Sequence, residues 1–185
     1  MKGFSIAKVA IANPVSTLDN FISIQKLMKK GAVIDKTGLY RYSLWREWDI
    51  EKPKLVFIML NPSKADADID DPTLRRCINF ANSWGFGSLT VVNLFAYRSA
   101  KPSDLRQVND PVGLQNDRYL KKAIKSADRV VVAWGNNGKL MQRDRLVLEL
   151  LSKHNIQPHC LGITQGGHPR HPLYVKCCTK IIDYE

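Results

Sequence analysis

The sequence predicts an α/β domain with three layers, α/β/α, around a short and mainly parallel sheet of four strands. Three observations lead to this fold class. The chain of 185 residues has the length of one ordinary domain. Hydrophobic residues make up 44% of it, which is enough to fill a core. Short β-branched apolar runs alternate with helical patterns, and this alternation is typical of parallel strands joined by right-handed helical crossovers.

The expected strands are four apolar runs that are continuous rather than alternating, a pattern typical of strands covered on both faces. They occupy residues 54–60, 88–94, 129–134 and 158–163. Neither an internal repeat nor a linker rich in Pro, Gly or Ser separates them. We therefore expect a single domain over residues 1–185, in which 1–50 adds a helix near 18–30 and a strand near 39–45.

Helical periodicity fills the intervals between the apolar runs. Segments 72–84, 112–127 and 140–151 each place their apolar residues on one stripe. Pro72 suits the first turn of the first helix, and Asp71 before it suits the cap. The second helix has a crowded basic outer face. This face consists of Arg118, Lys121, Lys122 and Lys125.

The charge balance points to a polyanionic partner. The chain has 28 Lys and Arg against 17 Asp and Glu, a formal net charge of +11. A strongly basic small domain typically binds nucleic acid, with an anionic membrane or an acidic protein as alternatives. No apolar run is long enough to cross a membrane, and the N-terminal apolar run is too short for a signal peptide. We expect a cytoplasmic monomer in which Cys77 and Cys160 are buried, reduced thiols.

The loops that follow the four strands are the expected site, because ligands bind beyond the carboxyl ends of parallel strands. Asn61-Pro62-Ser63 follows the first strand, and Asn93 lies at the end of the second. Trp134 ends the third strand, and a loop rich in Gly, His and Pro over 164–174 follows the fourth. Four polar loops at one rim predict one composite site.

The order of these motifs resembles that of the uracil-DNA glycosylase superfamily. The matching segments are Leu60-Asn61-Pro62-Ser63, Val91-Val92-Asn93, Val132-Ala133-Trp134-Gly135 and His171-Pro172-Leu173. They cover roughly residues 54–174. At closer range the runs NPS, DDPTLRR, NLFAYR, AWGNNG and GHPRHPLYV resemble a bacterial and phage domain-of-unknown-function family, number sixteen-forty-three in that series. That second resemblance spans nearly the whole chain but brings no established activity.

The superfamily resemblance implies an enzyme that hydrolyses the N-glycosidic bond of a flipped, damaged or modified base in DNA, in repair or in conflict with phage. It implies that Asn61 positions water and that His171 acts on the leaving base. Asp66, Asp68, Asp70 or Asp71, in the acidic stretch after Ser63, could supply a carboxylate, and we select Asp70. The implied base-binding residues are Asn93, Ser63 and Trp134. The expected DNA-binding residues are Arg75, Arg76, Arg98, Gly166, Gly167, His168, Arg170 and Leu173.

Several features depart from the superfamily pattern. Asn61 stands where the most active members carry Asp, so that position offers no strong base. The final motif is doubled, and His168-Pro169 competes with His171-Pro172 for its register. The cysteines do not match the iron–sulfur branch, and the His and Asp residues lack metal-ligand spacing, so we expect no cofactor and no metal.

Two other functions remain open at this stage. One is a non-catalytic module that binds nucleic acid or nucleotides on the same fold, and the other is an enzyme acting on free nucleosides or nucleotides. Simple structural roles are also open for single residues. Asn61 could form the turn before Pro62, Asn93 could hydrogen-bond a loop at a strand end, and Asp71 could only cap its helix.

Overall fold

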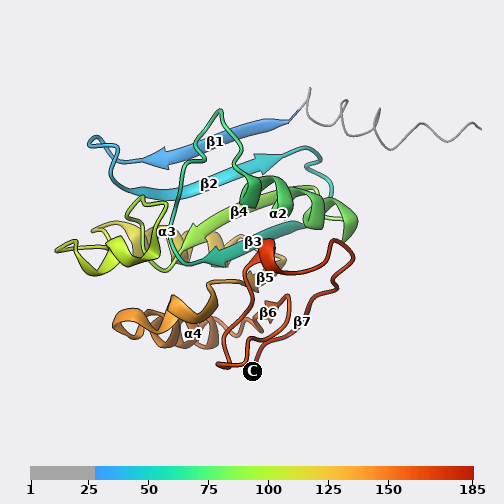
Figure 1. Cartoon of the computed structure of the whole chain (residues 1–185). Helices are drawn as coiled ribbons and strands as arrows, with labels where there is room; N and C mark the ends of the chain where they lie inside the picture. Colours follow the sequence, from blue (N-terminus) through green and yellow to red (C-terminus); the bar gives the residue numbers. More distant parts are fainter. Residues whose placement is uncertain (1–27) are drawn as a thin grey trace, which may run out of the picture.

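The computed structural model describes residues 28–185 and has the predicted α/β architecture. Its sheet is mixed and has seven strands in the order β1-β2-β4-β3-β5-β6-β7 (Figure 1). The four expected strands form the centre and run parallel to one another. They are β3 (Lys54–Met59), β4 (Ser88–Asn93), β5 (Arg129–Val132) and β6 (His159–Cys160).

The sheet is wider than the four strands that the sequence predicted, because antiparallel strands extend both of its edges. These are β1 (Lys29–Ile34) and β2 (Arg41–Glu47) on one edge and β7 (Ile182–Asp183) on the other. β2 is the strand expected near 39–45. The helix expected near 18–30 falls mostly outside the described residues, and its last two positions belong to β1. β1 begins with two lysines and contains Gly31, so it lacks the apolar run that identified the central strands.

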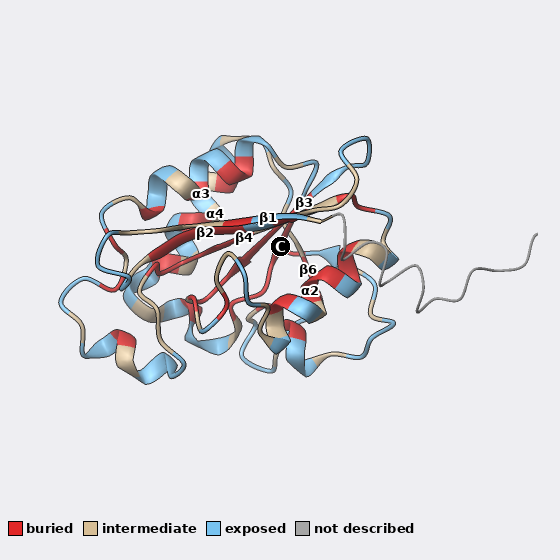
Figure 2. Cartoon of the chain, turned by 90° about the horizontal axis from the view of Figure 1, so that it is seen from above, coloured by how far each residue is buried: buried red, intermediate tan, exposed pale blue. Residues whose placement is uncertain are grey.

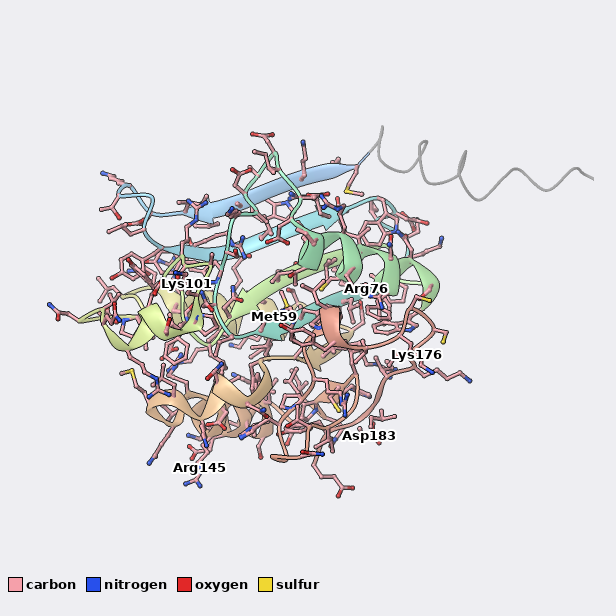
Figure 3. The ribbon with its side chains drawn as sticks, viewed as in Figure 1. Met59, Arg76, Lys101, Arg145, Lys176 and Asp183 are labelled. Carbon is pink, nitrogen blue, oxygen red and sulfur yellow. The ribbon has the colours of Figure 1, made fainter. Side chains whose placement is uncertain are left out.

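Helices cover both faces of the sheet, as Figure 2 shows. α2 (Pro72–Ser83) packs on one face, and α3 (Asn116–Lys125) and α4 (Arg143–Lys153) pack on the other. Buried strand residues alternate between the two cores. Leu55, Phe57 and Met59 of β3 join the α2 core, and Val56 and Ile58 join the α3–α4 core. Met59 thereby lies near the middle of the molecule, whereas Arg145 and Lys176 project from its periphery (Figure 3).

Local sequence sets where the helices begin. The Asp71 carboxylate accepts a hydrogen bond of 2.8 Å from the backbone N–H of Leu74, so Asp71 caps α2 as predicted. α4 starts at Arg143 rather than near 140, because Met141 and Gln142 adopt left-handed backbone conformations with φ of 53° and 56°. The preceding residues form the 3-10 helix η2 (Gly135–Gln142). Two further 3-10 helices are η1 (Pro102–Arg106) and η3 (Pro172–Tyr174).

Other sequence expectations about burial are confirmed. Cys77 and Cys160 are buried. The apolar stripe of α3 is buried, and its four cations are exposed. Among residues 28–185, no helix is long and apolar enough to cross a membrane.

Candidate functional site

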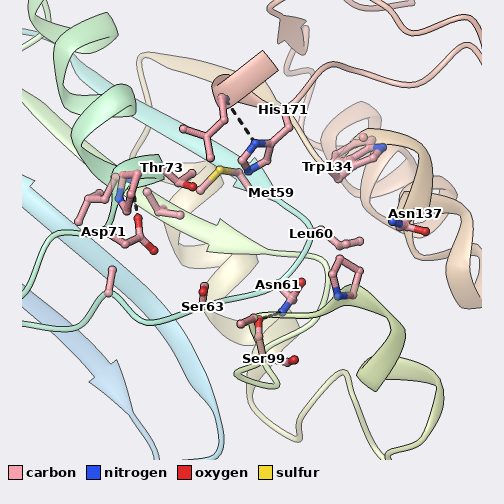
Figure 4. Close-up of a pocket in the computed structure, with 18 of the residues that line it drawn as sticks. Met59, Leu60, Asn61, Ser63, Asp71, Thr73, Ser99, Trp134, Asn137 and His171 are labelled. Carbon is pink, nitrogen blue, oxygen red and sulfur yellow. Dashed lines mark hydrogen bonds between the residues drawn. The ribbon is translucent and has the colours of Figure 1, made fainter. Parts of the chain in front are cut away.

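A pocket of about 610 Å³ lies at the carboxyl ends of β3 and β5, where the strand order predicts a ligand site (Figure 4). The first turn of α2 and the short helix η3 form two of its walls. Its apolar lining includes Leu44, Met59, Leu60, Leu74, Val91 and Trp134. Its polar and charged lining includes Arg41, Asn61, Ser63, Lys64, Asp71, Thr73, Ser99, Asn136, Asn137, Thr164, Arg170 and His171.

Asn61 lies in this pocket with a fixed amide. Its Nδ2 donates to the backbone carbonyls of Pro62, at 3.0 Å, and Ser99, at 2.8 Å. These two bonds define which side of the amide carries nitrogen, so Oδ1 is the atom left to accept a hydrogen bond from a ligand or water. The residue therefore presents an acceptor to the pocket.

His171 lines the pocket on a different wall from Asn61 (Figure 4). It is the residue before η3, and its Nδ1 accepts from the backbone N–H of Leu173 at 3.4 Å. An accepting Nδ1 carries no proton, so the neutral ring bears its hydrogen on Nε2. Burial lowers the pKa of His171 below its ordinary value of 6.5, although Asp71 opposes the shift. The ring is therefore a neutral hydrogen-bond donor at pH 7.

The doubled His-Pro motif resolves into two different placements. Whereas His171 lines the pocket, the Nδ1 of His168 lies 3.9 Å from the carboxylate of Asp144 in α4. The backbone N–H of His168 also donates to the Thr164 hydroxyl at 3.2 Å. His168 therefore lies beside α4 and does not line the pocket.

Trp134 forms part of the apolar lining and is almost fully buried. Its ring packs edge-on against Tyr184, with centroids 6.2 Å apart. Gly138 crosses so closely that a Cβ there would come within 2.1 Å of the indole Cδ1. The indole is thus held from two sides, which makes it a rigid wall for a flat ligand.

Asn93 lies just beneath the pocket rather than in its lining. Its side chain is 1% exposed, and neither its Oδ1 nor its Nδ2 has a partner among residues 28–185. Val91 belongs to the α2 core, and strand alternation turns Asn93 toward the same face, opposite Met59 in the parallel register. Both Val91 and Met59 line the pocket. A buried amide without a hydrogen-bond partner destabilises the fold. Asn93 is thus an unpartnered polar side chain directly below the pocket floor.

The acidic stretch contributes less than expected. Asp70 does not line the pocket, because its Oδ1 accepts from Nε of Arg46 at 2.9 Å and from Nη2 at 2.6 Å. Asp71 does line the pocket, but one of its oxygens is engaged in capping α2. In the described part of the chain, no lining carboxylate is therefore entirely free to take a proton from water.

The expected DNA-binding residues divide into two groups. Arg170 and Leu173 line the pocket. The other basic residues make local contacts. Arg75 donates to the Asp70 carbonyl at 2.5 Å, Arg98 donates to the Gly38 carbonyl at 3.1 Å, and Arg76 lies over the Phe80 ring and donates to the Val175 carbonyl. Gly166 and Gly167 are exposed in the loop after β6.

The structure thus brings part of the expected set together. The members that line one pocket are Asn61, Ser63, Trp134, Arg170, His171 and Leu173. The members outside it are Asp70, Arg75, Arg76, Asn93, Arg98, Gly166, Gly167 and His168. The basic face of α3 lies in the layer opposite α2, so the sheet separates it from the α2 side of the pocket.

Arg41 is a pocket residue that the sequence analysis missed. It is the first residue of β2, 3% exposed, and it lines the cavity. The signal was present in the sequence, because Arg41 stands within the strand expected at 39–45 and Arg46 follows it directly. A buried cation in such a strand needs a partner of opposite charge.

Residues 41–173 match a family model whose description is protein of unknown function (DUF1643). The chain belongs to the DUF1643 family. The match begins at Arg41 and ends at Leu173, so it contains every residue that lines the pocket except Tyr174. The searches among curated proteins and among solved structures each found no match. Within residues 28–185 of this DUF1643 member, no group of three or more His, Cys, Asp or Glu side chains is placed to hold a metal ion.

Proposed function

We propose that this protein is a DNA glycosylase-like enzyme that takes one flipped base into the pocket and hydrolyses its N-glycosidic bond. The observation that carries the proposal is the presence in one cavity of Asn61, with a free acceptor oxygen, and His171, with a neutral donor ring. The order of the motifs, which resembles that of the uracil-DNA glycosylase superfamily, also supports it.

The chemistry requires a donor on the side of the leaving base. As the glycosidic bond breaks, positive charge develops on the sugar and negative charge on the base. A neutral His171 can donate through Nε2–H to an oxygen of the departing base and stabilise that charge as it forms. Its lowered pKa keeps the ring neutral, and the Leu173 N–H keeps the proton on Nε2.

The attacking water requires an acceptor rather than a strong base when the sugar is already cationic. The Oδ1 of Asn61 can accept a hydrogen bond from water and orient it, because Nδ2 is held by two carbonyls. An amide oxygen does not remove a proton at pH 7, so the water must react with a largely dissociated sugar. The C1′–N bond breaks with its electron pair going to the base, the water oxygen then bonds to C1′, and the water's proton passes to the departing base anion or to solvent. The stabilisation of the leaving base at His171 is then the more important contribution.

The rim of the pocket supports a flipped nucleotide as the ligand. Leu173 is 45% exposed and Tyr174 is 76% exposed, and both line the pocket on η3. Exposed apolar side chains at such an opening can fill the space that a base leaves in the stack. The net charge of +11 favours approach of the DNA backbone.

The second candidate is a non-catalytic module that binds a nucleotide or nucleic acid in the same pocket. The nearby carboxylates favour this candidate because both are engaged in structural contacts: Asp70 pairs with Arg46 and Asp71 caps α2. Both candidates require ligand binding in the pocket, and only the first requires bond cleavage.

An abasic-site assay separates the two candidates. The protein is incubated with single- and double-stranded DNA that carries uracil, hypoxanthine, hydroxymethylated or glucosylated bases, and strands are then cleaved with alkali. We expect cleavage that Asn61→Ala and His171→Ala reduce by about 10²-fold or more. Asn109→Ala, at an exposed loop position, and His154→Ala, at the end of α4, are the matched controls. Tight binding without abasic sites on any substrate would favour the second candidate.

A further inference from the structure

We propose that Arg41 is the oxyanion-binding residue of the pocket and that it takes a phosphate group of the nucleotide ligand. The proposal deepens the proposed function and rests on it for the nucleoside part of the ligand. It does not require that the glycosidic bond be broken.

The Arg41 guanidinium is buried without a full set of partners. Nη1 donates to the Ala65 carbonyl at 2.5 Å. Nε has no hydrogen-bond partner among residues 28–185, and Arg41 forms no ion pair with any carboxylate in that range. A guanidinium carries five N–H donors in a planar fork, so most of its capacity in the described part of the chain is unused.

Arg46, on the same strand, shows what a structural arginine looks like in this fold. It is completely buried, and its Nε and Nη2 both donate to Asp70. Its Nη1 donates to the Trp45 carbonyl at 2.8 Å, and Nη2 also donates to the Asp66 carbonyl at 2.8 Å. The two arginines share a strand and a depth of burial, and only the one that lines the pocket lacks a carboxylate partner among residues 28–185.

Arg41 keeps its charge despite this burial. Burial lowers the pKa of Arg41 to about 10, with Asp71 opposing the shift, so the group stays protonated at pH 7. A buried charge without a counter-ion destabilises a fold, and an anionic ligand would provide the missing counter-ion. A guanidinium is also the side chain best shaped for phosphate oxygens.

The charges of the rest of the lining also favour an anionic ligand. Lys64 and Arg170 add two cations, whereas Asp71 is the one lining carboxylate among residues 28–185. The twelve-residue helix α2 begins at this wall, and the N-terminal end of a helix attracts negative charge. Figure 4 shows Asp71 and Thr73 on one side of the pocket and Trp134 on the other, with Met59 and His171 between them. A phosphate near α2 leaves the apolar floor and Trp134 for the remainder of a nucleotide.

The test measures thermal unfolding with probes that carry no base, so the unknown base preference does not matter. The probes are 2-deoxyribose 5-phosphate, an abasic pentanucleotide that presents internal phosphodiesters, and 2-deoxyribose as the uncharged control. We expect one or both phosphate probes to raise the Tm of the wild type and 2-deoxyribose to leave it unchanged. A response to the first probe alone assigns the site to a terminal phosphate, and a response to the pentanucleotide alone assigns it to a phosphodiester.

Three variants locate the binding site. Arg41→Met removes the charge and keeps the volume, and we expect it to bind the phosphate probes about 10- to 100-fold more weakly. Without ligand it should unfold at the wild-type Tm or above, because it removes an unpaired buried charge. Arg46→Met should unfold at a lower Tm, because it leaves Asp70 without its partner. Lys36→Met, at an exposed position in the turn between β1 and β2, should match the wild type in both properties.

Two results would overturn the proposal. One is a wild-type Tm that neither phosphate probe raises, and the other is an Arg41→Met variant that responds to the probes as the wild type does. Failure of the proposed glycosylase function has a different signature. In that case no abasic site forms on any DNA substrate, while phosphate binding that depends on Arg41 persists.

Discussion

Replacing Asp70 by Asn tests whether this carboxylate serves the fold or the chemistry. Asp70 was the carboxylate selected from the sequence as catalytic, and the structure pairs it with Arg46 outside the pocket lining. The substitution Asp70→Asn keeps the shape of the side chain and removes its charge. The completely buried Arg46 guanidinium would then lose its counter-ion while keeping its bonds to the carbonyls of Trp45 and Asp66.

The magnitude follows from the burial of the two partners. Removing one member of a buried ion pair costs about 3–5 kcal/mol. The Asp70 side chain is 21% exposed, so water offsets part of the loss and the lower end of that range applies, about 3 kcal/mol. For a domain of this size that corresponds to a Tm lowered by roughly 6–12 °C.

Urea denaturation, followed by fluorescence, measures this loss as a lower midpoint at an unchanged m-value. Asp68→Asn is the matched control, because that side chain is 84% exposed and pairs with Lys30 only at the surface, at 3.6 Å. We expect the control to stay within about 0.5 kcal/mol of the wild type. An Asp70→Asn variant with wild-type stability would refute the structural role. If that same variant had also lost abasic-site formation, Asp70 would be catalytic as the sequence analysis proposed.

Three further predictions follow from the site. Asn61→Asp should destabilise the fold by about 1–3 kcal/mol rather than restore an active base, because the carboxylate would face the two carbonyls that now accept from Nδ2. Urea denaturation measures the loss, and an unchanged midpoint together with faster cleavage would contradict the prediction. Single-turnover cleavage should be constant above pH 6.5 and slow below it as His171 is protonated, because its folded pKa lies below 6.5 and protonation removes the Nδ1 acceptor. The contribution of neutral His171 to the free energy of unfolding has the same pH dependence: it is fully present above pH 6.5 and is lost as the pH falls through the lowered pKa. A cleavage rate that rises toward about pH 5 would exclude a neutral donor. Replacing Lys121, Lys122 and Lys125 together by Ala should reduce the slope of log affinity for DNA against log salt concentration by up to about 3, the value expected if all three contact phosphates. An unchanged slope would mean that the basic face of α3 is exposed to solvent without contacting DNA.

The centre of the fold could be predicted from sequence because its signals are local. Continuous β-branched runs identified β3, β4 and β5, and Pro72 after Asp71 located the start of α2. The edges of the sheet carry no such signal. β1 is a lysine-rich strand that forms only by pairing with β2, and β7 is a two-residue pairing with β6. Pairing between segments far apart in the chain is a tertiary interaction, which a pattern within one segment does not encode.

Part of the site was predictable because its residues follow closely on a strand, and Arg170, His171 and Leu173 of the loop after β6 were also expected there. Asn61 and Trp134 come shortly after β3 and β5, so the topology alone brings them to the same rim. The roles of Asp70 and His168 depend on partners elsewhere in the chain, Arg46 and Asp144. Local patterns favoured His171 over His168 and made Asp71 a helix cap, but they did not indicate that Asp70 pairs with Arg46.

The two buried arginines of β2 show how such partners could be found without a structure. A strand covered on both faces places each guanidinium in a medium that does not tolerate an unpaired charge. The acidic stretch that follows β3 offers carboxylates to both, but Asp66 and Asp71 have roles in local turns and caps. Asp68 is exposed and pairs with Lys30, Asp70 pairs with Arg46, and Arg41 remains without a carboxylate partner among the described residues. Matching each buried cation to the acids that remain free therefore singles out Arg41, which is why we propose that a ligand provides its negative charge.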